Sequence, residues 1–446
     1  MPGALFQIGR SGADAARASL EVTSQNIANA SNPDYARRTL SSRELVGISA
    51  SGNGVLNGVR IEGITRFDSA IVQQQARQSA SELARADTEL AALRDTELAL
   101  EQSSLFEGLV EFEAVLTQLE GNPLEPALRT NALETGRQLA STFQFANSTL
   151  ATARGQVQAS TAISLDDANL QAAELARITQ TLANARDGTA GQAALLDARD
   201  AARRALSQEV GIETEFDSRG AVTVRLADAS GAAGPLLVDG LTSSDITSTT
   251  APDGTVSFAV GGAAVTPASG ALAGQAAALE AQADYQIELD AIAAEIIALS
   301  NAAQASGADA DGNPGQPFFT GTGAADIELA LTSGTQLATA PAGSPAGSTN
   351  TTNLASFVAS IGGDDGPIAR TDTLLLGLSS RISAQEVTRT GLAAIAENAQ
   401  ATLLTETGVD LDTEAANLIR LQQAFEANSR VMQVATEIFD TLLGLR

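Results

Sequence analysis

"LDTEAANLIRLQQAFEANSRVMQVATEIFDTLLGLR", residues 411–446, carries the strongest hydrophobic periodicity of the chain. Apolar side chains recur in it at spacings of three and four residues, which is the heptad pattern of a helix packed along a partner helix. The members of this stripe are Leu411, Leu418, Leu421, Phe425, Asn428, Met432, Ala435, Phe439 and Leu442. Further apolar residues lie off the stripe, so the helix has more apolar surface than one partner can cover.

From periodicity alone, burial of this C-terminal helix within its own domain is the commoner outcome. Packing against the other end of the chain and against neighbouring subunits is the alternative.

The first thirty residues predict a second, weaker helix. Small or weakly apolar side chains recur at helical spacing between Leu5 and about Ala30. This stripe consists of Leu5, Ile8, Gly12, Ala15, Ser19 and Val22, and Asn26 and Asn29 continue it with polar groups. Such a helix is marginal alone and needs neighbours. Asn32-Pro33-Asp34 ends it, because the residue before a proline is pushed away from helical angles.

Composition limits the partners and the chemistry of this chain. The 446 residues include 26 basic residues, all of them Arg, against 53 carboxylates, for a net charge of -27. Nucleic acid is therefore an improbable partner, and so is an anionic membrane surface, because both require basic protein surface. No Cys and no His is present, which excludes Ser-His-Asp and Cys-His catalytic sites and zinc sites of the usual kind. We expect no cleaved signal peptide and no membrane span.

Between the two ends, helical and β-like segments alternate. Helical sequence is expected at residues 69–102, 129–186, 193–210, 271–305 and 371–406, and β-like sequence at residues 40–67 and 211–270. We predict a mainly α fold with a small β insertion. Residues 1–39 and 408–446 would pair as a coiled-coil-like inner domain. Residues 40–210 with 271–407 would form an elongated, mainly helical middle domain, and residues 211–270 a β-rich outer domain.

Carboxylates are the remaining candidates for catalysis or metal binding. Asp87 with Glu89 and Glu111 with Glu113 have the spacing of solvated helix faces, and aromatic platforms for a sugar substrate are scarce because aromatics make up 3% of the chain. The loop from Asp309 begins like a calcium-binding loop, but Pro and Thr stand where the turn Gly and the bidentate Glu are required. We predict no catalytic residue, no metal site and no cofactor.

Both ends of the chain carry motifs of a known family. "LFQIGRSGADAARASLEVTSQNIANASNPDYARRTL", residues 5–40, resembles the N-terminal signature of bacterial flagellar axial proteins, in which an Asn-Ile-Ala-Asn run precedes a Pro-Gly-Tyr turn. Asp34 stands here in place of the Gly. Residues 408–446 are similar to the C-terminal signature of the same proteins. The interior segments "GNPLEPALRTNALETGRQLASTFQFANSTL", "AALLDARDAARRALSQEVGI" and "DADGNPGQPFF" resemble the hook-associated protein 1 family within that group.

The resemblance implies a structural junction protein of the flagellum. Such a protein self-assembles into a ring or helical layer on the distal end of the hook, beside the hook protein, and connects to the filament through a second junction protein. The resemblance also implies export by the flagellar secretion apparatus to an extracellular site, without a cleaved signal peptide, and an export chaperone at the C-terminal helix. The implied assembly interface comprises the C-terminal stripe together with Leu5, Ile8, Val22, Asn26, Ile27, Asn29, Pro33 and Tyr35.

Two other functions remain open at this stage. A hook or rod subunit would share the same terminal signatures. A secreted surface hydrolase that uses a carboxylate pair belongs to a different class, and it would need a cleft lined by paired Asp or Glu and by aromatic residues.

Overall fold

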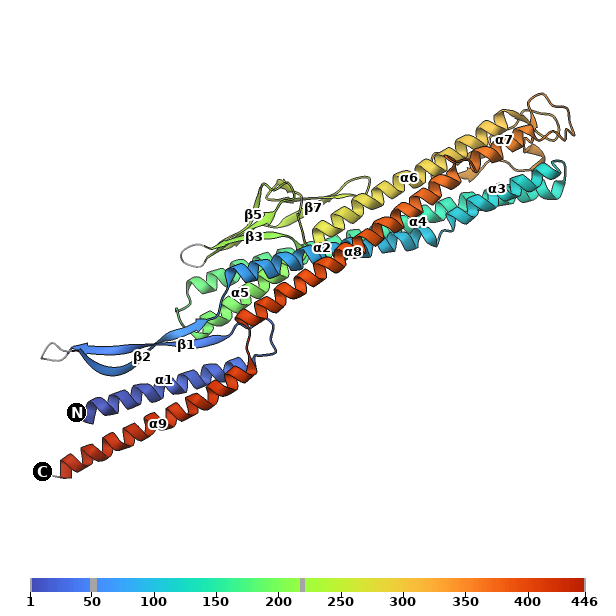
Figure 1. The fold of residues 1–446 in the computed structure, drawn as a ribbon. Coiled ribbons are helices and arrows are strands. Elements are labelled where there is room, and N and C mark those ends of the chain that lie inside the picture. Colours follow the sequence, from blue (N-terminus) through green and yellow to red (C-terminus); the bar gives the residue numbers. More distant parts are fainter. Residues whose placement is uncertain (1, 49–53, 217–220, 445–446) are drawn as a thin grey trace.

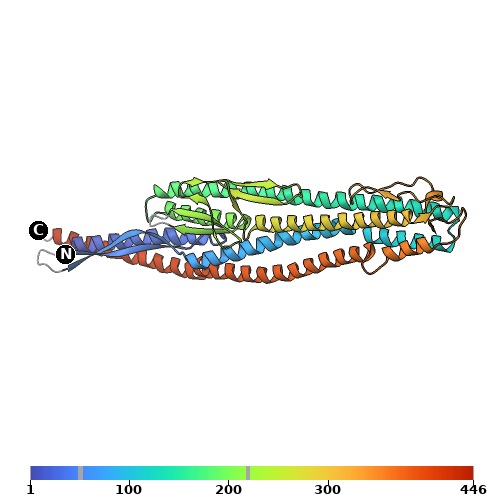
Figure 2. The same cartoon turned by 90° about the horizontal axis from the view of Figure 1, so that it is seen from above.

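The computed structural model describes residues 2–48, 54–216 and 221–444. The molecule is elongated, with long helices running side by side to form a body, and a narrow extension at one end (Figure 1). Both chain termini lie at the tip of that extension, and the view from above shows the same arrangement (Figure 2). The mainly α fold with a small β insertion predicted from the sequence is confirmed.

Helices supply most of the described structure, and α4, α5 and α8 each begin three or four residues before the expected positions. Their bounds are α1 (Pro2–Ala28), α2 (Ala70–Glu101), α3 (Leu105–Gly121), α4 (Pro126–Ala183), α5 (Ala190–Glu209), α6 (Ala271–Ala305), α7 (Thr352–Ile361), α8 (Pro367–Thr407) and α9 (Leu411–Gly444). Pro126 and Pro367 stand at the first helical position of α4 and α8, where a missing N–H costs nothing. Gly408, after α8, separates it from α9.

Strands occur in a long hairpin, in the β insertion and in short pairs at the far end of the body. They are β1 (Arg38–Ile48), β2 (Gly54–Arg66), β3 (Ile212–Phe216), β4 (Val222–Ala227), β5 (Ala233–Asp239), β6 (Thr242–Ser243), β7 (Ile246–Thr250), β8 (Val256–Val260), β9 (Ala263–Val265), β10 (Gly307–Ala308), β11 (Phe319–Thr320), β12 (Glu328–Leu329) and β13 (Ala340–Pro341). All the described pairings are antiparallel, with sheet orders β1-β2, β3-β4-β5-β6, β7-β8-β9, β10-β13 and β11-β12.

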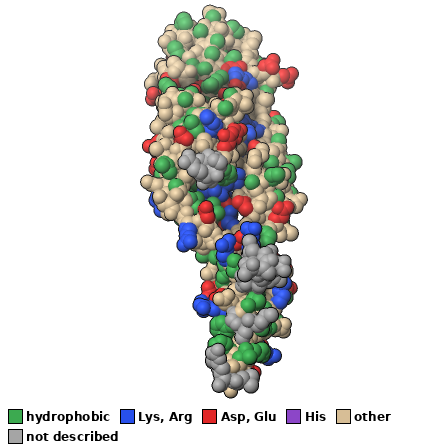
Figure 3. Space-filling model, turned by 90° about the vertical axis from the view of Figure 1, so that its left-hand side faces the viewer, with side chains coloured by type: hydrophobic (Ala, Val, Ile, Leu, Met, Phe, Trp, Pro, Cys, Tyr) green, Lys and Arg blue, Asp and Glu red, His purple; other side chains and the backbone are tan. Residues whose placement is uncertain are grey.

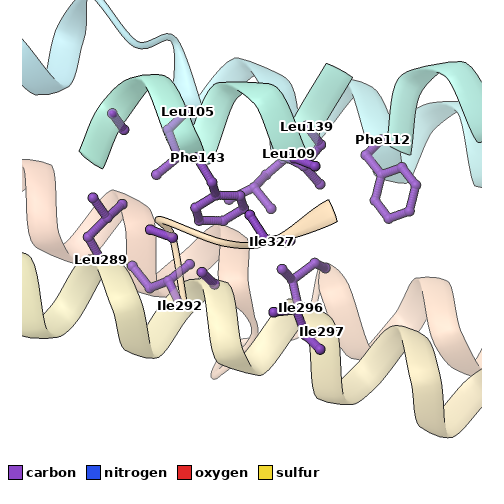
Figure 4. Close-up of a cluster of buried hydrophobic side chains, with 14 of the residues drawn as sticks. Leu105, Leu109, Phe112, Leu139, Phe143, Leu289, Ile292, Ile296, Ile297 and Ile327 are labelled. Carbon is purple, nitrogen blue, oxygen red and sulfur yellow. The ribbon is translucent and has the colours of Figure 1, made fainter. Parts of the chain in front are cut away.

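The main hydrophobic core lies in the distal half of the body, between α3, α4, α6 and the chain that follows α6. Leu109, Phe112 and Phe143 are fully buried there and face Ile292 and Ile296 of α6 (Figure 4). The ring of Phe112 also lies within 5.6 and 6.2 Å of the rings of Phe318 and Phe319, as tilted aromatic pairs do. Large apolar side chains from several elements therefore interlock around one core.

The β insertion has a core of its own against the second half of α4. Strand β4 alternates buried and half-buried residues along its length, as expected for a strand with one covered face. Its Val222, Val224 and Leu226 pack with Leu175 and Ile178 of α4 in one buried cluster. The insertion therefore rests on the helical body.

The β1–β2 hairpin lies beside the terminal helices, although all of it except Arg38 and Thr39 falls within the range 40–210 that we assigned to the middle domain. It packs along α1 (Figure 1), and the Ser11 hydroxyl of α1 accepts a hydrogen bond from the Val59 amide of β2 at 3.1 Å. Backbone bonds also tie the hairpin to the body, since the Ile64 amide donates to the Gly188 carbonyl at 2.8 Å. The predicted boundary between the inner and middle domains at residue 39 stays a prediction. The hairpin contacts described here lie on both sides of it.

Candidate assembly interface

The predicted pairing of the two ends of the chain is confirmed, because α1 and α9 lie side by side (Figure 1). Glycines on α1 allow the close approach. A Cβ on Gly9 would lie 2.9 Å from Met432 Cγ, and one on Gly12 would lie 2.5 Å from Asn428 Oδ1. Gly12 belongs to the stripe predicted from the sequence. Ala13 and Ala16 of α1 are also deeply buried, although the predicted stripe omits them. They are buried because the hairpin covers α1 in addition to α9.

The predicted stripe on α9 contains two interleaved seven-residue series that fare differently. Leu421, Asn428 and Ala435 belong to the series nearer α1 and are buried or half-buried, whereas Leu442, at the end of the same series, is 52% exposed. Glu414, seven residues before Leu421 and outside the predicted stripe, is buried on the same side of α9. The other series is more exposed, with Leu411 at 53% and Phe439 at 52%. The contact between α1 and α9 is narrow, because α1 presents glycines and alanines to it. A helix with small side chains at the contact covers only a small part of the circumference of its neighbour.

Large apolar side chains consequently remain on the outer surface of the helix pair. On α9 the exposed ones are Leu411, Ile419, Phe425, Val431, Val434, Ile438, Phe439 and Leu442, and on α1 they are Leu5 and Phe6. We call these ten residues the terminal apolar surface. Several of them belong to the predicted stripe and several lie off it. A concentration of this kind on one slender element marks an interaction surface.

The segment from Asn26 to Arg38 joins α1 to the hairpin, and Asn26 is its centre. The Asn26 amide donates to the Arg38 carbonyl at 2.9 Å and to Glu414 Oε2 at 3.2 Å. Its oxygen accepts from the Tyr35 hydroxyl at 2.8 Å and from the Arg38 amide at 3.1 Å. Glu414, 1% exposed, also pairs with Arg37 at 2.7 Å. Asn26 therefore fixes the turn after α1 and links it to α9.

The other predicted interface residues divide by exposure. Val22, Asn26, Tyr35 and Ala435 are buried within the chain, so they act in pairing and in the joint. Ile8, Ile27, Asn29, Leu418, Leu421, Asn428 and Met432 are half-buried, whereas Pro33 is exposed. The Asn29 side chain donates to the Gln25 carbonyl at 2.8 Å and so satisfies the C-terminal turn of α1.

An arginine–aspartate network fixes the hairpin to α5, at the base of the terminal extension. Arg66 bonds Asp197 and Asp200 at 2.6 Å each, and Arg38 bonds Asp197 at 2.5 Å. Arg203 reaches Asp200 at 3.1 Å. Burial acts to raise the pKa of Asp200, but Arg66 and its neighbouring guanidinium groups outweigh burial and hold that pKa below its ordinary value.

Sequence reasoning missed this network and Glu414. Arg38 and Asp197 are separated by 159 positions, and no local pattern connects them. Glu414 did give a signal, because it stands seven residues before Leu421 on the buried side of the heptad pattern. A carboxylate at such a position needs a buried partner.

The interpretation of Asp87 and Glu89 as a solvated helix face is wrong for Glu89. This residue is 7% exposed, and its carboxylate accepts from Arg381 of α8 at 3.1 Å. Asp87 pairs with Arg389 of the same helix at 2.6 Å. Glu89 also accepts from the Gln385 side-chain amide at 3.2 Å, so these carboxylates bind α2 to α8.

The loop that begins like a calcium site uses its first carboxylate for its own backbone. Asp309 accepts hydrogen bonds from the amides of Asp311 and Asn313 at 2.9 and 2.8 Å. Residues 2–48, 54–216 and 221–444 contain no group of three or more acidic side chains placed to hold a metal ion. None of the helices in these ranges combines the length and hydropathy that crossing a bilayer requires.

Two segments of the chain match models of known protein families. Residues 91–319, about half of the chain, match the family model described as the flagellar hook-associated protein FlgK helical domain. The chain belongs to the FlgK family. The match extends from α2 through the β insertion to the distal core. Residues 400–445, which include α9, also match the flagellar basal body rod FlgEFG protein C-terminal model.

Individual FlgK-family relatives are similar over part of their length. Flagellar hook-associated protein 1 of Escherichia coli strain K12 is 28% identical over 222 residues, which are 49% of this chain and 41% of the relative. The protein of the same name from Salmonella typhimurium strain LT2 is 27% identical over 327 residues, 70% of this chain and 58% of the relative. This chain thus spans 41 and 58% of the two relatives.

A solved structure of the family is also similar to this chain. The flagellar hook junction protein FlgK from Burkholderia pseudomallei matches with a TM-score of 0.49 and 21% identity, over 55% of this chain and 46% of that one.

Proposed function

We propose that the chain is a structural junction protein of the bacterial flagellum. It would assemble on the distal end of the hook and connect the hook to the filament through the next junction protein. The terminal apolar surface is the observation that carries this proposal. It lies on the extension that holds both chain ends, and the FlgK family to which the chain belongs is hook-associated by name.

Assembly would bury the terminal apolar surface between neighbouring copies. A side of one α1–α9 pair that meets a different side of the next pair gives a head-to-tail contact, and such contacts close into a ring or continue as a helix. Residues 1–39 with 408–446 would form the inner domain of this layer. The helical body and the β insertion would then lie further out.

Export to the cell exterior through the flagellar secretion apparatus is part of the same proposal. Phe425, Val434 and Phe439 on α9 are exposed, and an export chaperone bound to α9 would cover them before assembly. The proposed role requires no catalysis, cofactor, nucleic acid or membrane.

The proposal is tested by the double variant Val434→Glu with Phe439→Glu. Both residues are 52% exposed in the monomer, so the chain should fold normally. Burial of the two carboxylates at a subunit contact would cost several kcal/mol. We expect an exported protein that does not cap hooks, so that cells carry bare hooks and release flagellin into the medium.

A matched control places the same charges on the body. Ile163 and Leu170 of α4 are each 63% exposed, and the double Glu variant at these positions should assemble. Secretion is measured separately for both variants, because a chaperone on α9 would read the same residues. If the α9 variant is exported and still supports full-length filaments, the terminal apolar surface does not drive assembly.

A second candidate, a rod or hook subunit, is favoured by one observation. Residues 400–445 match the C-terminal model of basal body rod proteins. Immunogold labelling of purified hook-basal bodies separates the two functions. Label confined to the distal end of the hook supports the junction, whereas label along the hook or on the rod supports the second candidate.

A further inference from the structure

A small cavity lies at the joint between the terminal extension and the body. Its volume is about 50 Å³, and the segment after α1, the end of β2, α2, α5 and the C-terminal turns of α8 all contribute to its lining. Three arginines line it, Arg66, Arg77 and Arg204, against two aspartates, Asp34 and Asp200. On the face shown in Figure 3, basic side chains gather near the level at which the body narrows. The local charge balance is thus opposite in sign to that of the whole chain.

Arg77 is the arginine of this cavity that has no carboxylate partner among the residues that the structure describes. Arg66 is bonded to Asp197 and Asp200, and Arg204 is bonded to Asp34. The side chain of Arg77 has neither a hydrogen bond nor an ion pair with any residue that the structure describes, although Arg77 is only 9% exposed. It lines the cavity, and it also lines a second one of about 180 Å³ beside it.

The electrostatics of the joint disfavour an unaccompanied guanidinium at this position. Burial, and after it the charge of Arg203, lower the pKa of Arg77 to about 10, with Arg199 and Arg204 acting in the same direction and Asp200 opposing them. A buried cation without a partner is strongly unfavourable, and a guanidinium presents five donors in a plane that fits an oxyanion. A group with several acceptor oxygens would satisfy these donors.

We propose that this cavity binds a small inorganic oxyanion, of the phosphate or sulfate class, with Arg77 as its principal ligand. A space of this size holds a few water molecules or one such ion. The occupant would contact Arg77 of α2 on the body side and the segment at Asp34–Ala36 on the side of the extension. It would therefore stabilise the joint in addition to neutralising Arg77.

The test uses the full chain as a monomer, titrated with sodium phosphate and with sodium sulfate against sodium chloride at constant ionic strength. We expect a saturable rise in the thermal midpoint of about 1 to 2 °C with either oxyanion and no rise with chloride. Phosphorus-31 NMR measures binding of inorganic phosphate directly. Arg77→Gln should weaken that binding about tenfold or more, as expected for loss of a charge-assisted contact.

Two further variants separate binding from a merely structural role. Arg77→Lys keeps a point charge and should retain much of the response. Arg85→Gln, an exposed position on the same helix, removes an equal charge and should leave the response unchanged. Circular dichroism verifies that each variant is folded.

Several results would overturn the proposal. One is the absence of an oxyanion-specific shift in the unmodified chain, and another is an equal shift in Arg77→Gln. A third is a midpoint that depends on protein concentration and not on oxyanion, because Arg77 would then be satisfied by a carboxylate from a second copy of the chain.

Discussion

Four phenylalanines distinguish the body from the terminal extension. Phe112 and Phe143 in the body are 0% exposed, whereas Phe425 and Phe439 on α9 are 38 and 52% exposed. The body encloses its large side chains among several helices, and its core is complete within one chain. The extension buries small residues at its seam and leaves large ones outside. Stability is therefore concentrated in the body, and the extension retains apolar area that another molecule can cover.

Truncation of a body phenylalanine should give the largest change in stability. Phe143→Ala deletes a ring that packs against α3 and α6 (Figure 4), and the cavity adds to the lost burial. We expect the free energy of unfolding to fall by about 3 to 5 kcal/mol. Urea denaturation followed by circular dichroism measures it. A loss below about 1 kcal/mol would mean that the distal core is not closely packed.

Between the two regions lies the arginine–aspartate network, and Asp200→Asn tests it. The variant leaves Arg66 and Arg203 without their shared carboxylate, although the remaining amide oxygen still accepts one hydrogen bond. We expect a loss of about 3 kcal/mol at pH 7, the lower end for a broken buried ion pair. Urea denaturation at pH 7 gives this value.

The same variant has a defined dependence on pH. The pKa of Asp200 is lowered in the folded chain, so the stability that its carboxylate contributes is present above the unfolded pKa, about 3.9. That contribution is lost as pH falls through the lower folded pKa. The difference between wild type and Asp200→Asn should therefore shrink below about pH 4. A difference that stays constant from pH 7 to pH 3 would contradict the assigned pKa direction.

The smallest effect is expected where the same atoms are removed from the extension. Phe439→Ala deletes a ring that is half exposed and should change the free energy of unfolding by no more than about 0.5 kcal/mol. It is the matched partner of Phe143→Ala, and urea denaturation of both gives the contrast directly. Equal losses in the two variants would show that the extension has a completed core of its own.

The architecture could be predicted from the sequence wherever the signals were local. Helix α6 begins and ends at the residues expected, because Gly270 and the Gly-rich loop after Ser306 bound an Ala-rich helical sequence that no Pro interrupts. The two stripes of helical period left the pairing of α1 with α9 as one alternative, and the matched signatures at the two chain ends favoured it. The terminal signatures added the family resemblance, which the match to the FlgK helical domain confirms over the body.

What could not be predicted depends on contacts between distant parts of the chain. Arg38 and Asp197 give no pattern until the hairpin lies on α5. Glu89 resembled a surface residue because its partner, Arg381, lies in α8 and not in α2. The exposure of Phe439 could not be predicted either. Heptad spacing indicates which residues share one face of a helix, but not how much of that face the partner helix covers.

The hairpin between β8 and β9 has a practical consequence for labelling. Gly261 and Gly262 form its two-residue turn, both with positive φ, and a side chain at either would meet no neighbouring atom within 4 Å. An epitope tag or fluorescent domain attached at either chain end would occupy the tip where the extension exposes its apolar residues. Inserted between these two glycines, on the flank of the body, the same tag would leave that tip free. Loop-closure entropy grows slowly with insert length, so even a folded reporter would be tolerated there.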